Sequence, residues 1–281
     1  MDFKKFLNLI MIEQTLFALP FAYIGVLFAG GRSMSTWFWV TIALFAARTS
    51  GMSFNRVIDA KIDAKNPRTK ERLIPKGEVK PFTVWIISLF FLFLLIFSSY
   101  MLNKLCFYLS FIAGAMLFAY SYFKRFSSSS HFFLGFVEAC APIGGYLAVT
   151  GEITLFPLLL GLIILTWIAG IDILYATQDM DFDKKENLKS IPAKLGKEKA
   201  VILSGLNYFF SIIFMILAGI ITKRDLPYWI GIIFIGLIFI RQQQLGKNSN
   251  LCDNMKKIFK LNTYISPLLF LAIFIDIFIW G

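Results

Sequence analysis

The chain alternates between long apolar segments and short charged loops, and this pattern constrains its fold more than any other feature. A helix needs about 20 apolar residues to cross the hydrocarbon core of a bilayer. Hydrophobic residues make up 58% of the 281 residues, which is enough for many such helices. We predict an all-α, polytopic membrane protein in which residues 1–281 form a single transmembrane domain. The nine predicted spans are 7–29, 36–58, 83–101, 104–123, 132–150, 155–178, 199–222, 226–241 and 261–280.

Lysine and arginine lie mostly on one side of these predicted spans. Of the 28 such residues, 23 fall on the side of the N-terminus, four fall on the other side, and Arg48 lies within a span. Because cytoplasmic loops are enriched in Lys and Arg, we predict a cytoplasmic N-terminus and an outside C-terminus in the inner (cytoplasmic) membrane. The same bias explains the net charge of +11, so membrane lipid, and not nucleic acid, is the expected partner of the surface.

Two acidic clusters stand at the predicted cytoplasmic ends of the second and sixth spans. Each spaces its polar side chains three or four residues apart, so that they share one helix face. The last three members of the second cluster each follow their counterparts by 120 residues, which suggests an internal duplication. The first cluster is Asn55, Asp59 and Asp63, and the second is Asp172, Tyr175, Asp179 and Asp183.

Carboxylates at a membrane edge are costly to bury, so they indicate a functional site. Four facing carboxylates repel one another unless cations lie between them. The ligands are oxygens, which favours a hard cation: Mg²⁺ first, with manganese as an alternative. Basic residues in the following loops suit a polyanion such as diphosphate. These are Lys61, Lys65, Arg68, Lys70 and Arg72 after the first cluster, and Lys184, Lys185 and Lys189 after the second.

Cysteine and histidine give no sign of another kind of site. Cys106, Cys140 and Cys252 are scattered without the spacing of a zinc site or a disulfide framework. The single histidine, His131, begins an apolar segment, and we interpret it as an interfacial residue without a catalytic role.

The loops complete two longer motifs. The first is Asn55-x-x-x-Asp59-x-x-x-Asp63 followed by Asn66-Pro67-Arg68-Thr69-x-x-Arg72-x-x-Pro75-x-Gly77, and the second is Asp172-x-x-Tyr175-Ala176-x-x-Asp179-x-x-x-Asp183 followed by Lys189-Ser190. Together and in this order, they resemble the two signatures of the UbiA superfamily of intramembrane prenyltransferases. The chain departs from the common pattern at Arg56, where many members have Asp, and at Asn187, where many have Gly.

This resemblance implies nine helices around a central cavity that opens sideways to lipid. It also implies Mg²⁺-dependent transfer of a prenyl group from a polyprenyl diphosphate to an acceptor, often an aromatic one. By position, the expected roles are metal binding for Asp59, Asp63, Asp179 and Asp183, diphosphate binding for Asn55, Arg68, Arg72 and Lys189, and a place near the reacting carbon for Asp172 and Tyr175.

The acceptor is expected to be an aromatic acid. The motif version with Asn55 and Arg56 resembles family members that act on 4-hydroxybenzoate, or on a naphthoate of menaquinone synthesis, and we take 4-hydroxybenzoate as the first choice. A dihydroxynaphthoate or a glycerol phosphate lipid is the alternative. Arg48 lies seven residues before Asn55 on the same helix face, where a cation must be paired or face a cavity. It either binds the acceptor carboxylate or forms a structural pair with Glu13 or Glu138.

Three other interpretations compete with this one. In the first, the acidic and basic residues are solvated loop charges, although orientation by the membrane requires no carboxylates. An ion-coupled transporter would place its acids near the bilayer midplane, whereas these lie at span ends. A phospholipid-forming phosphotransferase would require a Gly and an Arg around its paired aspartates, and the segment from Asp59 to Asp63 lacks both.

Overall fold

The structure is a computed structural model that describes residues 2–247 and 251–280, without the side chains of 251–253, so Cys252 lies outside the description. Within these residues the fold is entirely helical. The elements are α1 (Phe3–Ile10), α2 (Ile12–Phe28), α3 (Met34–Ile58), α4 (Ala60–Asp63), α5 (Pro81–Leu102), α6 (Lys104–Phe126), α7 (Ser130–Thr150), α8 (Leu155–Ala176), the 3₁₀ turn η1 (Thr177–Asp179), α9 (Met180–Lys185), α10 (Ile191–Leu195), α11 (Lys197–Ile221), α12 (Leu226–Lys247), α13 (Leu251–Ile275) and the π-helical turn η2 (Asp276–Trp280).

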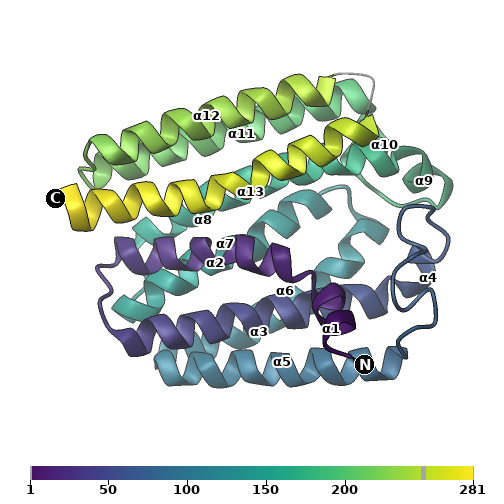
Figure 1. Cartoon of the computed structure of the whole chain (residues 1–281), viewed down its shortest axis with the longest axis horizontal. Helices are drawn as coiled ribbons and strands as arrows, with labels where there is room; N and C mark the ends of the chain where they lie inside the picture. The colour runs from purple at the N-terminus through teal and green to yellow at the C-terminus, as the bar shows by residue number, and fades with distance from the viewer. Residues whose placement is uncertain (1, 248–250, 281) are drawn as a thin grey trace.

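The long helices run side by side, and the short helices α4, α9 and α10 gather with their loops at one end (Figure 1). The C-terminus lies at the opposite end. Each of the nine predicted spans corresponds to a long helix in the described part of the chain. Seven helices have the length and apolar content of a membrane span, and the bent pair α1 and α2 brings the number to as many as eight. The protein is therefore a polytopic membrane protein, although α3 falls short of that apolar content and nine spans are not confirmed.

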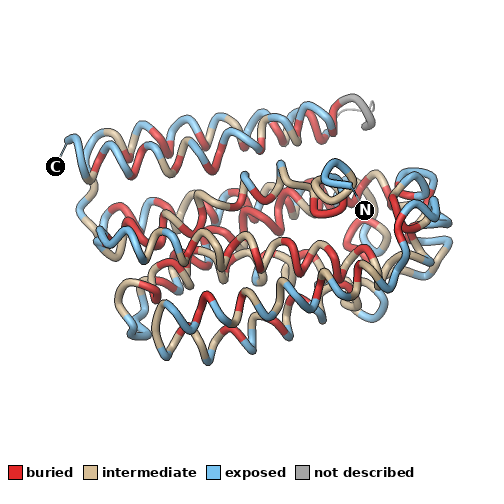
Figure 2. Tube along the Cα trace, turned by 60° about the horizontal axis from the view of Figure 1, so that its bottom comes forward, coloured by how far each residue is buried: buried red, intermediate tan, exposed pale blue. Residues whose placement is uncertain are grey.

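The outer faces of the bundle are apolar, as expected for contact with lipid acyl chains. Figure 2 shows exposed residues along the outward faces and buried residues along the inward faces. Many of the exposed side chains are large hydrophobic ones, such as Phe93 on α5 and Phe209 on α11. Helix ends follow local signals: Pro81 occupies the first turn of α5, and the Asn103 side chain accepts a hydrogen bond from the Cys106 amide at the start of α6.

Two predicted boundaries were wrong. The first predicted span is bent by 55° at Met11, which adopts a left-handed backbone conformation (φ 49°, ψ 63°). Its first part, α1, is strongly amphipathic and buries Leu9 and Ile10 against the loop that follows α4. The helix of the last predicted span, α13, begins at Leu251, and its candidate membrane span begins at Asn254 instead of residue 261. The exposed Lys256 and Lys257 conceal this start in the sequence, although the other face of the helix is buried.

Glycines let α7 pack closely against its neighbours. A Cβ atom on Gly145 would lie 2.0 Å from the Ala22 carbonyl oxygen of α2, and a Cβ on Gly25 would lie 2.0 Å from the Pro142 carbonyl oxygen of α7. Close backbone approach at small residues is the usual means of packing membrane helices, because lipid provides no hydrophobic driving force between them. These contacts fix the position of α7, which forms one wall of the cavity described next.

Candidate active site

A cavity of about 1510 Å³ lies inside the bundle. It is larger than the roughly 300–1,000 Å³ of typical small-molecule sites, so it has room for two substrates. On α6 the lining residues extend from Cys106 to Lys124, a length of roughly 27 Å at 1.5 Å per residue. Its lining is charged at the end formed by the two predicted acidic motifs and mainly apolar elsewhere.

The two acidic motifs break their helices at the same position. Asp59 follows the last residue of α3 with φ −90° and ψ 1°, and Asp179 precedes α9 with φ −97° and ψ 5°. Both residues lie in the sparsely populated region between helix and strand, which is common at active sites. The 120-residue offset in sequence therefore corresponds to the same local backbone, in support of the suggested duplication.

All four predicted metal-binding aspartates line the cavity, and each forms an ion pair with a basic residue. Arg125 lies 3.0 Å from Asp59, Arg72 2.6 Å from Asp63, Arg68 2.6 Å from Asp179, and Lys124 2.8 Å from Asp183. Burial raises the pKa of Asp59 even though Arg125 donates a hydrogen bond to it. The repulsion expected among the four carboxylates is thus relieved by side chains of the protein itself.

Arg68 joins the two halves of the site. Its Nε and Nη2 donate to the two carboxylate oxygens of Asp179 at 3.0 and 2.6 Å, and its Nη1 donates to the Tyr175 hydroxyl at 2.6 Å. Asn66 adds a bond from Nδ2 to Asp179 Oδ1 at 3.1 Å. The loop after the first motif therefore holds the second motif in place. Within the first motif, Asn55 Nδ2 donates to Asp59 Oδ2 at 2.7 Å.

Of the four aspartates, Asp183 is the strongest candidate to bind a further cation. Its side chain is fully buried, and neither carboxylate oxygen has a hydrogen-bond partner, because the Lys124 ion pair lacks hydrogen-bonding geometry. No group of three or more His, Cys, Asp or Glu side chains among the described residues could hold a metal ion. The donor set nevertheless fits Mg²⁺, which commonly uses one or two carboxylates and takes its other ligands from substrate phosphates and water.

His131, interpreted from sequence as interfacial, lies in the site. It is buried, and its Nδ1 is 2.6 Å from Asp172 Oδ2. The Ile191 backbone amide donates to its Nε2 at 3.2 Å, so Nε2 is an acceptor and Nδ1 carries the proton of a neutral ring. His131 therefore donates to Asp172 and fixes that carboxylate in the cavity wall. The interpretation of His131 was wrong, because nothing in its local sequence indicates a partner 41 residues away.

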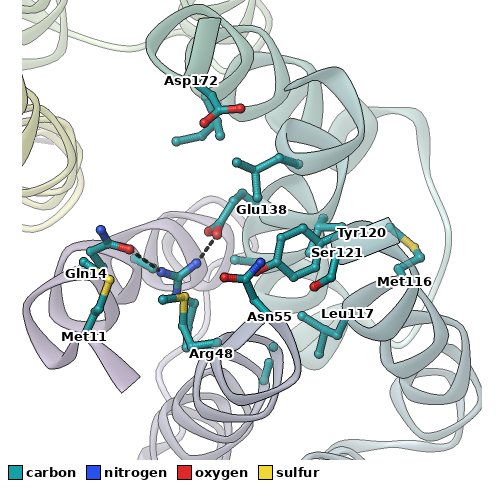
Figure 3. A pocket seen from close by; sticks show the side chains of 18 of the residues that line it. Met11, Gln14, Arg48, Asn55, Met116, Leu117, Tyr120, Ser121, Glu138 and Asp172 are labelled. Atoms are coloured by element: carbon teal, nitrogen blue, oxygen red, sulfur yellow. Dashed lines mark hydrogen bonds and ion pairs between the residues drawn. The ribbon is translucent and has the colours of Figure 1, made fainter. Parts of the chain in front are cut away.

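Arg48 forms one of the structural pairs considered above. Its Nη1 donates to Glu138 Oε1, and its Nη2 lies 3.5 Å from Gln14 Oε1 (Figure 3). Figure 3 also shows Asn55 and Asp172 around the same space. Because Arg48 and Glu138 both line the cavity, the pair faces the space that an acceptor would enter.

The basic residues of the site differ from the prediction. Lys189 is exposed and is not among the residues that line the cavity, whereas Lys124 and Arg125 line it. In the sequence, these two residues are indistinguishable from the other Lys and Arg residues on the side of the N-terminus. Because their partners, Asp59 and Asp183, lie about 60 residues away in either direction, only the fold brings these groups together.

The fold and site define a class: an all-helical membrane protein whose internal cavity carries paired acidic and basic residues at one end and an apolar lining beyond. Residues 18–264 match the UbiA prenyltransferase family. Since this match extends over most of the sequence, the chain belongs to that family.

Curated relatives and solved structures agree with this assignment. The chain is 31% identical over 273 residues to a 4-hydroxybenzoate octaprenyltransferase of Haemophilus ducreyi, covering 96% of this chain and 95% of the relative. It is 28% identical over 267 residues to the enzyme of the same name from Serratia proteamaculans, covering 95% and 89%. The apo structure of a UbiA homolog from Aeropyrum pernix K1 superposes with a TM-score of 0.87 at 27% identity, covering 94% and 98%.

A more distant structure shares the fold. A UbiA homolog from Archaeoglobus fulgidus, bound to DMAPP and Mg²⁺, superposes with a TM-score of 0.73 at 19% identity, covering 98% of this chain and 99% of the other.

Proposed function

We propose that this protein transfers a polyprenyl group from a polyprenyl diphosphate to an aromatic acid, with 4-hydroxybenzoate as the first candidate acceptor and quinone biosynthesis as the setting. One observation carries the proposal: the four aspartates of the two motifs, together with their basic partners, line the charged end of a cavity whose remainder is mainly apolar. The names of the relatives, 4-hydroxybenzoate octaprenyltransferase, support the choice of acceptor.

In this proposal the charged end of the cavity binds the diphosphate together with Mg²⁺. Asp59, Asp63, Asp179 and Asp183 would hold the metal, which supplies Lewis-acid stabilisation of the leaving group when bound. The guanidinium groups of Arg68 and Arg72 suit the bidentate recognition of phosphate oxygens and lie beside these carboxylates. Lys189 is the weaker candidate for such a contact because it does not line the cavity.

The reaction exchanges two bonds at one carbon. The bond between the allylic carbon and the diphosphate oxygen breaks, and its electron pair leaves with the diphosphate. A ring carbon of the acceptor then bonds to the allylic carbon and loses its proton. Asp172 is positioned to receive this proton, because it lines the cavity and the contact of 2.6 Å between its Oδ2 and His131 Nδ1 orients its side chain. Tyr175 contacts both Arg68 and Phe259 and would flank the reacting carbon.

The apolar part of the cavity suits both the prenyl chain and a cationic transition state. Leu44, Leu95, Leu117 and Leu134 are among its lining residues, and they would exclude the water that otherwise captures an allylic cation. The protein would lie in the inner (cytoplasmic) membrane with the charged end of the cavity and the N-terminus toward the cytoplasm, as the distribution of Lys and Arg predicts.

Diphosphate release by the purified protein in detergent tests this function. The assay uses geranyl diphosphate and longer donors, with Mg²⁺ present or chelated. The acceptor panel contains 4-hydroxybenzoate, a dihydroxynaphthoate and a glycerol phosphate lipid, with products identified by mass spectrometry. We expect Mg²⁺-dependent release with prenylated 4-hydroxybenzoate. A product on another acceptor would change the substrate, and no release with any donor length would contradict prenyl transfer.

The role proposed for Arg48 has a separate test. If Arg48 also contacts the acceptor carboxylate, Arg48→Leu should raise the KM for 4-hydroxybenzoate by about tenfold or more and change the donor KM much less. The matched control is Arg48→Leu combined with Glu138→Leu, which leaves no buried unpaired carboxylate. Recovery of the acceptor KM in this double variant would limit Arg48 to neutralising Glu138.

A further inference from the structure

Arg56 lies in the last turn of α3, between two hollows in the protein. It lines the large cavity, and it also lines a smaller pocket of about 200 Å³ that is bounded by α1 and the loop after α4. Asp63, Arg68 and Arg72 line both hollows as well. Arg56 is thus part of the wall that carries the charged groups of the site.

Arg56 is only 8% exposed, yet it has no partner. Among the hydrogen bonds and ion pairs of the described residues, none involves its guanidinium group. The guanidinium nitrogen atoms also remain accessible to solvent. Arg56 has no atom among the side-chain nitrogen and oxygen atoms that are both buried and without a hydrogen-bond partner. The guanidinium therefore opens on the hollows that it lines.

The other basic residues at this end of the cavity are already neutralised. Arg68, Arg72, Lys124 and Arg125 each pair with one of the four aspartates. The nearby carboxylate of Asp63 is held by Arg72, whose Nη1 lies 2.7 and 2.6 Å from its two oxygens. Among the described residues Arg56 forms no such ion pair, and the charge of the nearby Asp63 is already shared with Arg72.

Burying an unpaired charge is expensive, and a protein retains one where a ligand supplies the partner. A guanidinium has five N–H donors in a planar fork that matches phosphate oxygens. Arg56, Arg68 and Arg72 line the same two hollows, and these three groups together suit a ligand with several negative oxygens.

We propose that Arg56 binds the diphosphate of the prenyl donor directly, as an additional phosphate-binding residue beside Arg68 and Arg72. This inference rests on the proposed function and names one more group of the same site. It has a specific consequence: Arg56 destabilises the ligand-free protein and contributes to stability only when the anion is bound.

Thermal unfolding and calorimetric binding of inorganic pyrophosphate, with and without Mg²⁺, test this inference in the purified full-length protein. We expect Arg56→Met to unfold at the same or a higher temperature than the parent without ligand. Its affinity for pyrophosphate should fall about 10- to 100-fold, the equivalent of losing a hydrogen bond between charged groups. Arg56→Lys keeps the charge and should lose less affinity.

The control is Arg241→Met, which removes an exposed arginine of α12 that does not line the cavity and should change neither quantity. If Arg56→Met lowers the ligand-free unfolding temperature and leaves pyrophosphate affinity unchanged, Arg56 is structural and the inference is overturned. If Arg56→Met does not fold, the test uses Arg56→Lys and Arg56→Gln. The inference is then overturned if both variants bind pyrophosphate as tightly as the parent. Failure of the parent itself to bind pyrophosphate or a prenyl diphosphate would contradict the proposed function.

Discussion

Replacing Asp183 with asparagine is expected to reduce Mg²⁺-dependent diphosphate release by at least about 100-fold, the usual effect of removing one electrostatic group from a reaction centre. The substitution keeps the shape of the side chain and removes the charge that a metal ion requires. The buried carboxylate accepts no hydrogen bond, and its ion-pair partner Lys124 is one-third exposed, so water can solvate the ammonium when the carboxylate charge is lost. The unfolding temperature of the ligand-free protein should therefore change little. The rate of diphosphate release should therefore fall while the unfolding temperature stays nearly constant. Release assays and thermal unfolding of the same sample measure the two quantities.

Asp181→Asn is the matched control for this variant. Asp181 is two residues away on the same helix, but it is exposed and does not line the cavity. Release by Asp181→Asn should equal that of the parent within about twofold, the scatter expected for a surface substitution. If Asp183→Asn retained parental activity, the proposed metal-binding role of the second motif would be wrong.

Replacing Gly145 with alanine is expected to lower the unfolding temperature more than any other single-methyl change along α7. The added Cβ would lie 2.0 Å from the Ala22 carbonyl oxygen, so α2 and α7 must separate. Such overpacking costs about 1–3 kcal/mol and more when backbone must move. Gly145→Val should leave little folded protein in detergent, as measured by size-exclusion chromatography and thermal unfolding.

The adjacent residue provides the control. A Cβ on Gly144 would meet no other atom within 4 Å, so Gly144→Ala should leave the unfolding temperature unchanged or raise it. The reciprocal variant Gly25→Ala should behave like Gly145→Ala, because its Cβ would lie 2.0 Å from the Pro142 carbonyl oxygen. Equal unfolding temperatures for the Gly144 and Gly145 variants would show that this helix crossing tolerates expansion.

Apolar length was sufficient to predict where the long helices lie, because a membrane-spanning helix is a local property of the chain. The bend at Met11 was missed, since its left-handed backbone depends on α1 packing against Leu73 and Ile74 of a distant loop. The start of α13 was missed for a related reason: its first turns alternate exposed lysines with buried Met255 and Ile258, which lowers the average hydropathy.

The acidic residues of the site could be predicted because their spacing is local and repeats. The partners of these residues could not be predicted, since Lys124, Arg125 and His131 are contributed by other helices and look ordinary in sequence. Lys189 shows the reverse case, because it is close to the second motif in sequence but does not line the cavity, and its predicted contact with diphosphate stays a prediction. Arg56 was recognised in sequence only as a departure from the common motif, and its lack of a partner is visible only in the folded chain.

The pair between Arg48 and Glu138 has a consequence for how the protein is made. An arginine at the centre of a membrane helix costs about 2.5–3.5 kcal/mol on insertion. Arg48 is synthesised 90 residues before Glu138, so α3 reaches the membrane before its counter-ion exists. Nor does α3 have the apolar content of the other spans. We therefore expect α3 to be held stably in the bilayer only once α7 lies beside it, so that the two helices would insert together and not as independent spans.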